Sequence, residues 1–316
     1  MKLLQDRRRL ALVYGWVVLG WTAVIIALRC VNIFCFFDSD IGYFQSNAIL
    51  PVLADAMTAL GAVIFAAAGI LLFAKSELAP ADTPSLALRI ASGVATVGFF
   101  ALVATDVLYG GSVWSAILGM GACLFFLLNI TKSGTPLVHV LSGLCVILRL
   151  IWILAKSYFD VTVQMNAPEK LALHLACVFG MLMTVSDLRA AVGKLRPAIF
   201  GASFALGTLF LGVASLPTVI ASLGGAWAHD AWLPETYALV ALFVYAAVRL
   251  MDYLLFPVPL PKPLPEPEAE EAIEEAVEEA TEEAAEETTT EEIEIPEEVK
   301  EEAPTEEPND PPEQET

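Results

Sequence analysis

The chain has 316 residues, of which 57% are hydrophobic, and its sequence pI is about 4.4. A soluble domain is about 45–50% apolar, so this composition excludes an ordinary soluble protein. The only run of adjacent basic residues is Arg7–Arg9, which is too short for a nucleic-acid-binding patch, so we expect no nucleic-acid partner.

The acidity belongs to one end of the chain. Residues 257–316 hold 23 Glu and one Asp against two Lys, a net charge of −22, whereas residues 1–256 hold 15 basic and 13 acidic residues, a net charge of +2. We therefore predict two parts, an apolar body (1–256) and an acidic tail (257–316).

Eight segments of the body contain about 20 mainly apolar residues, the length that a membrane-spanning helix needs. Segments this long can satisfy their backbone groups in a bilayer only as helices. The sequence therefore predicts an all-α, polytopic bundle of about eight spans with the lipid bilayer as its surroundings. The predicted spans are 10–34, 49–74, 88–109, 113–131, 137–157, 170–188, 197–222 and 235–256.

Turn and start signals separate these spans. Pro51 and Pro197 open the second and seventh spans, where a missing N–H costs nothing. Gly110-Gly111 predicts a tight turn before the fourth span. The first span is longer than the apolar core of a cleaved signal peptide, so we interpret it as a signal anchor.

Lys and Arg residues predict the orientation of the bundle. If the N-terminus is inside, ten of them lie in inner segments and three in outer ones. The positive-inside rule then predicts a multi-pass protein of the cell membrane with both termini cytoplasmic.

The tail has two parts. Residues 256–267 are rich in proline and predict a stiff polyproline II spacer. A four-residue repeat of the Ala-X-Glu-Glu type begins at Ala272. Because its glutamates repel one another at a spacing of four, we expect a disordered solvating tail. The alternative is a tail that binds a basic protein partner.

Five ionisable residues from five different spans form the candidate buried polar site. Such groups are costly inside a membrane and mark either a functional site or a packing pair. In the predicted topology all five lie in the outer half of the bundle. They are Arg29, Asp55, Asp106, Arg149 and His174.

The helical faces of three of these residues, Asp55, Arg149 and His174, predict that they point inward. Asp55 shares a stripe with small residues such as Ala62 and Gly69, which typically face other helices in membranes. Arg149 lies on a polar stripe of the fifth span. We therefore predict that Asp55 and Arg149 interact. Tyr245, Arg249 and Asp252 share a face of the last span near its inner end, and we interpret them as an interfacial anchor.

Three functions fit these features. The first is a membrane protein that handles or senses a small solute or ion through a polar site in the outer half of the bundle. The second is a structural or assembly subunit whose tail recruits a partner. The third is a membrane-embedded enzyme for a lipid-linked substrate, with Asp55, Asp106 and His174 as its catalytic candidates.

The motif search favours a protein that is not an enzyme. Phosphate-binding loops, the HExxH zinc motif and the GxSxG nucleophile motif are absent from the sequence. We assign no catalytic, cofactor-binding or metal-binding residue and expect no cofactor. The polar and aromatic residues 37–47 are interpreted as a lid. The sequence leaves open whether Cys30 and Cys35 form a disulfide.

Overall fold

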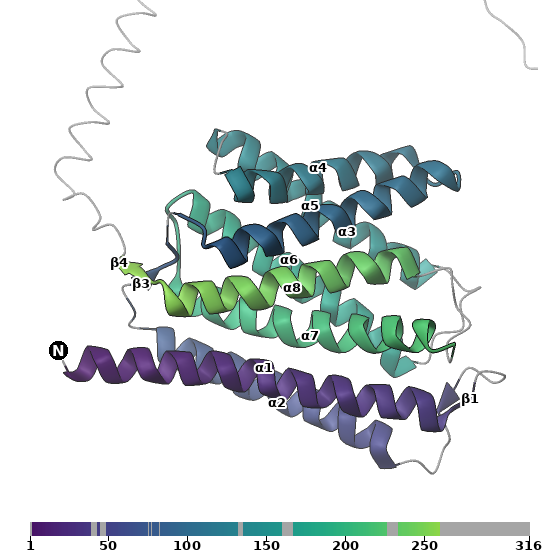
Figure 1. Cartoon of the computed structure of the whole chain (residues 1–316), viewed down its shortest axis with the longest axis horizontal. Coiled ribbons are helices and arrows are strands. Elements are labelled where there is room, and N and C mark those ends of the chain that lie inside the picture. The colour runs from purple at the N-terminus through teal and green to yellow at the C-terminus, as the bar shows by residue number, and fades with distance from the viewer. Residues whose placement is uncertain are drawn as a thin grey trace, which may run out of the picture. The chain divides into compact units, whose positions relative to one another are not determined.

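The computed structural model describes residues 2–38, 43–44, 49–74, 76, 78–81, 83–131, 135–159, 167–225 and 233–259. These residues form eight α-helices, and each helix corresponds to one predicted span (Figure 1). The helices are α1 (Lys2–Phe36), α2 (Ile49–Phe73), α3 (Leu86–Leu108), α4 (Val113–Thr131), α5 (Pro136–Phe159), α6 (Ala167–Ala191), α7 (Pro197–Leu223) and α8 (Leu233–Leu255).

All eight helices are long and apolar enough to cross a membrane, with mean hydropathies of 1.8 to 2.3. Many large apolar side chains lie on the outer surface, among them Trp16 and Leu71, which are 64% and 79% exposed. Hydrocarbon tails accommodate such a surface and water does not. The chain is therefore a multi-pass membrane protein.

Successive helices run in opposite directions, so the bundle has two ends (Figure 1). We call the end where α1 begins and α8 finishes the terminal end, and the other end the far end. The α2–α3, α4–α5 and α6–α7 connections lie at the terminal end.

Six of the helices form a closed ring. Each helix from α3 to α8 packs against the next one along the chain, and α8 packs back against α3. Helices α1 and α2 pack against each other and against the outer side of α7 (Figure 1). The interior of the six-helix ring is consequently separate from the α1–α2 pair.

Helix α7 is the most buried of the eight because it lies between the α1–α2 pair and the rest of the ring. Its glycines allow neighbours on several sides to approach closely. A Cβ atom at Gly207 would lie 2.9 Å from the sulfur of Met183 on α6, and one at Gly212 would lie 2.7 Å from the ring of Phe243 on α8. Small residues thus bring the helices together, as in other membrane bundles.

A proline interrupts α7 near the far end. Pro217 lies inside the helix, where it lacks the N–H that would bond to the carbonyl group four residues earlier. The far-end part of α7 therefore lacks one backbone hydrogen bond, although the helix continues to Leu223.

Two short antiparallel strand pairs join segments at the ends of the bundle. At the far end β1 (Phe37–Asp38) pairs with β2 (Tyr43–Phe44). At the terminal end β3 (Leu78–Ala79), from the α2–α3 connection, pairs with β4 (Val258–Pro259). The predicted proline-rich spacer therefore begins as a strand. Its remainder and the Glu-rich repeat lie outside the described residues.

The β3–β4 pair predicts where the chain can be cut. Removal of residues 261–316 should leave the melting temperature unchanged, because the strand pair stays intact. Removal of 257–316 deletes β4 and should lower the free energy of unfolding by about 0.5–1.5 kcal/mol per lost hydrogen bond. Thermal unfolding of both truncated proteins in detergent measures the difference. A large decrease in melting temperature after removal of residues 261–316 would contradict this account.

Candidate functional site

The five residues of the predicted polar site all lie in the far-end half of their helices, but they form separate groups. Arg29 on α1 and Asp55 on α2 form an ion pair with 2.6 Å between Nη2 and Oδ1. Arg29 is buried, whereas the Asp55 side chain is 41% exposed. This pair joins α1 to α2 outside the six-helix ring.

Arg149 and Asp106 form a second ion pair, inside the ring. Arg149 Nη2 lies 2.9 Å from Asp106 Oδ2, and the Arg149 side chain is 1% exposed. Ser115 on α4 donates a hydrogen bond to the same carboxylate at 2.6 Å and accepts one from Arg149 Nη1. Three consecutive helices of the ring, α3, α4 and α5, are thereby joined at one point.

The predicted contact between Asp55 and Arg149 is wrong, because each residue has a different partner. Arg149 lies on an inward face, whereas Asp55 lies at the edge of the buried face of α2 and is 41% exposed. Helix α2 packs against α1 and α7, whereas α5 packs between α4 and α6. A stripe of residues on a helix indicates which side is buried, but it does not identify the neighbour that covers it.

His174, the fifth predicted residue, is hydrogen-bonded at the far end. Its Nε2 lies 2.8 Å from the Ser157 hydroxyl oxygen, and that hydroxyl also donates to the carbonyl oxygen of Leu154 at 2.8 Å. The serine proton is thus engaged by the backbone, which disfavours Ser157 as a nucleophile. Beside this pair, Lys156 on α5 forms an ion pair with the buried Glu235 on α8 at 2.7 Å.

Apolar side chains fill the middle of the ring. Phe99 and Phe126 are fully buried and stack with 5.5 Å between ring centroids. Leu150 and Leu242 are also fully buried and approach Gly180 from α5 and α8. We call these four residues, Phe99, Phe126, Leu150 and Leu242, the plug. It separates the ion pairs of the far end from a second polar region at the terminal end.

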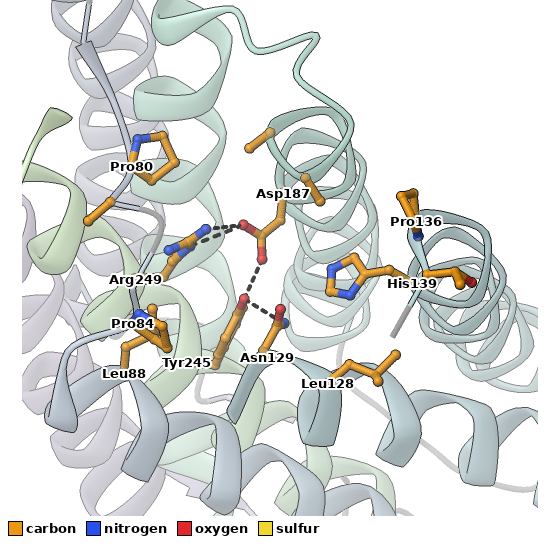
Figure 2. A pocket seen from close by; sticks show the side chains of 14 residues that line it. Pro80, Pro84, Leu88, Leu128, Asn129, Pro136, His139, Asp187, Tyr245 and Arg249 are labelled. Atoms are coloured by element: carbon orange, nitrogen blue, oxygen red, sulfur yellow. Dashed lines mark hydrogen bonds and ion pairs between the residues drawn. The ribbon is translucent and has the colours of Figure 1, made fainter. Parts of the chain in front are cut away.

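That second region is a cavity of about 270 Å³ between the ring helices and the α2–α3 connection (Figure 2). Polar side chains from four helices line it, and Pro80 and Pro84 line it on the side of the connection. The polar residues are Asn129 on α4, His139 on α5, Asp187 on α6, and Tyr245 and Arg249 on α8.

Asp187 is the centre of a hydrogen-bonded network in this cavity. Its Oδ1 accepts bonds from Arg249 Nε and Nη2 at 3.0 and 2.8 Å, and its Oδ2 accepts one from the Tyr245 hydroxyl (Figure 2). Asn129 Nδ2 donates to the Tyr245 oxygen at 3.2 Å. Arg249 thus donates two hydrogen bonds to one oxygen of the carboxylate and Tyr245 donates to the other, and the charge-assisted bonds from arginine are the stronger kind.

Arg249 also faces a second carboxylate, that of Asp252 one turn further along α8. The Nη1–Oδ2 distance is 3.8 Å, which is an ion-pair contact but too long for a hydrogen bond. Both carboxylate oxygens of Asp252 are buried without a hydrogen-bond partner. The guanidinium lies above the Phe200 ring of α7 as well, 5.7 Å from its centroid.

The interpretation of Tyr245, Arg249 and Asp252 as an interfacial anchor is wrong. Tyr245 and Asp252 are 2% and 3% exposed, and all three point into the bundle. The sequence reasoning overlooked Asp187. The sequence contained a signal for Asp187. A cation on an inward face, such as Arg249, needs an acid at the same depth, and Asp187 lies at that depth near the terminal end of α6.

The cavity offers hydrogen-bond donors and acceptors and charges of both signs, which suits recognition of a small polar molecule. Within the described residues, no group of three His, Cys, Asp or Glu side chains could hold a metal ion. All five cysteines are free, including Cys30 and Cys35.

Comparison of the chain with protein-family models, curated proteins and solved structures finds no match.

Proposed function

We propose that this membrane protein is a carrier for a small polar solute, which binds in the terminal-end cavity and crosses the membrane through the six-helix ring. The observation that carries the proposal is the cavity itself, with Asp187, Tyr245 and Arg249 at its wall. Its volume of about 270 Å³ corresponds to roughly nine water molecules at ~30 Å³ each, so the solute is small.

The layout of the ring supports a carrier. Two polar regions lie at opposite ends of its interior, and the plug separates them. The Asp106–Arg149 and Lys156–Glu235 ion pairs join helices at the far end, which supports a state closed there and open toward the terminal end. A carrier reaches its other state when such pairs separate and the opposite end closes.

The terminal end faces the cytoplasm in this proposal. The segments that the sequence predicts to be cytoplasmic lie at this end, and they contain most of the Lys and Arg residues of the body. The site is thus on the inner side, and not in the outer half where the sequence reasoning located it. The Arg29–Asp55 pair outside the ring has a structural role.

Cysteine accessibility tests the proposal. Asn129→Cys, in a protein whose five native cysteines are replaced, should react with a water-soluble, membrane-impermeant thiol reagent added from the cytoplasmic side. Leu127→Cys is the matched control, because Leu127 lies on the same helix at similar depth but is 45% exposed on the lipid-facing surface. Equal rates for the two variants would refute a water-filled cavity, and reaction only from the outside would reverse the orientation.

A further inference from the structure

Arg249 is the shared ion-pair partner of two buried carboxylates at the terminal end. Asp187 and Asp252 are each 3% exposed, and both are in ion-pair contact with Arg249. With both carboxylates ionised, this group of three would carry one uncompensated negative charge. A buried charge without a counter-charge costs several kcal/mol in a medium of low dielectric constant, so a further positive charge belongs here.

No second cation of the described residues forms an ion pair with Asp252 to provide this positive charge. Its neighbours on α8 are Tyr245, Arg249 and Tyr253, and across the ring lie Asp187 on α6 and His139 on α5. Helix α7 presents the phenyl ring of Phe200 to Arg249. At the terminal end, Arg9 on α1, Arg89 on α3 and Arg196 at the start of α7 are exposed, and Arg189 on α6 is half-buried. Among the described residues, the ion pair of Asp252 is with Arg249.

The two carboxylates differ in their hydrogen bonds. Asp187 accepts three, two from Arg249 and one from Tyr245, and each of them favours its ionised form. Asp252 accepts none, although both of its oxygens are buried. Hydrogen bonds to a carboxylate favour its charged form, so a proton shared by two acids at one positive group binds preferentially to the acid with fewer donors.

From this asymmetry we infer that Asp252 is a proton-binding site, which holds a proton while Arg249 is bound to Asp187. The site does not depend on the proposed transport function. If that function holds, the cavity and the proton are coupled through Arg249. A solute that binds Asp187 releases the guanidinium toward Asp252. The O–H bond of Asp252 then breaks, and its proton passes to water at the terminal end of the bundle.

Infrared spectroscopy of the full-length protein in lipid nanodiscs at neutral pH tests the inference. A protonated carboxyl group has a carbonyl stretching band well separated from that of ionised carboxylates. A carboxyl group in water is ionised at this pH and does not contribute to the band. The wild type should show the band, and Asp252→Asn should abolish it. Asp55→Asn, which alters the one-to-one Arg29–Asp55 ion pair outside the ring, should leave it unchanged.

A second variant identifies the protonated acid without altering either carboxylate. Tyr245→Phe removes a hydrogen bond that only Asp187 receives. The band should keep its frequency in this variant if the proton is on Asp252, and it should shift if the proton is on Asp187. Absence of the band from the wild type, its persistence in Asp252→Asn, or a shift in Tyr245→Phe would overturn the inference. Cysteine labelling tests the cavity separately, so failure of one proposal is distinguishable from failure of the other.

Discussion

Replacement of Asp106 by Ala is expected to lower the free energy of unfolding by about 3–5 kcal/mol, the usual cost of removing one partner from a buried ion pair. The reason is the environment of Arg149, which is 1% exposed and has Asp106 as its ion-pair partner. Without that carboxylate, the Ser115 hydroxyl is the hydrogen-bond partner that the guanidinium keeps within the described part of the chain. Reversible unfolding in mixed detergent micelles measures the loss.

Asp55→Ala is the matched control for this prediction. Asp55 also pairs with a buried arginine, but its side chain is 41% exposed, so solvent or lipid headgroups can replace it and the loss should be well under that of Asp106→Ala. The double variant Asp106→Ala with Arg149→Ala should lose less than the sum of the two single variants. Additive losses would show that the two residues do not interact.

Phe126→Ala should have an effect of similar size, at the lower end of the roughly 3–5 kcal/mol typical of Phe-to-Ala changes in protein cores. Phe126 is fully buried and contacts the rings of Phe99, Phe125 and Tyr245. Truncation leaves a void in the plug. Inside a membrane the loss comes from van der Waals packing, since lipid is as apolar as the plug.

Phe100→Ala provides the comparison for Phe126→Ala. Phe100 lies on α3 next to the plug residue Phe99, but it is 57% exposed on the outer surface. Lipid tails can fill the space that this truncation leaves, so we expect a change of less than about 0.5 kcal/mol, as for surface substitutions in general. Equal losses in the two variants would mean that the ring interior is not tightly packed.

The sequence was sufficient to predict the helices, because the length and hydropathy of a span are local properties. Each predicted span has its helix, with ends that differ by a few residues except at α1, which begins eight residues earlier than predicted, at Lys2. It also located the depth of the charged residues, since the position of Asp106 or Arg149 along a span follows directly from the span's limits.

The partners of those residues could not be predicted in the same way. The sequence predicts inward faces and similar depth for Asp55 and Arg149, but the packing order of the helices decides which side chains meet. Packing order depends on contacts such as that between Gly207 and Met183, which involve residues far apart in the chain. Asp187 was overlooked for the same reason, since its importance comes from Arg249 on a different helix.

The central claim is that the ring interior opens alternately at its two ends, and pulsed electron–electron double resonance tests it most directly. Helices α4 and α7 lie on opposite sides of the ring. Spin labels at Val113 and Leu223 therefore report the width of the far end, and labels at Thr131 and Arg196 report that of the terminal end. All four positions are exposed.

Each pair of labels should give two distance populations. Asp106→Asn weakens the ion pair that closes the far end. It should increase the population with the longer Val113–Leu223 distance and, together with it, the population with the shorter Thr131–Arg196 distance. A single narrow distance at both ends, in the wild type and in the variant, would contradict the account and would identify the ring as a rigid structural bundle.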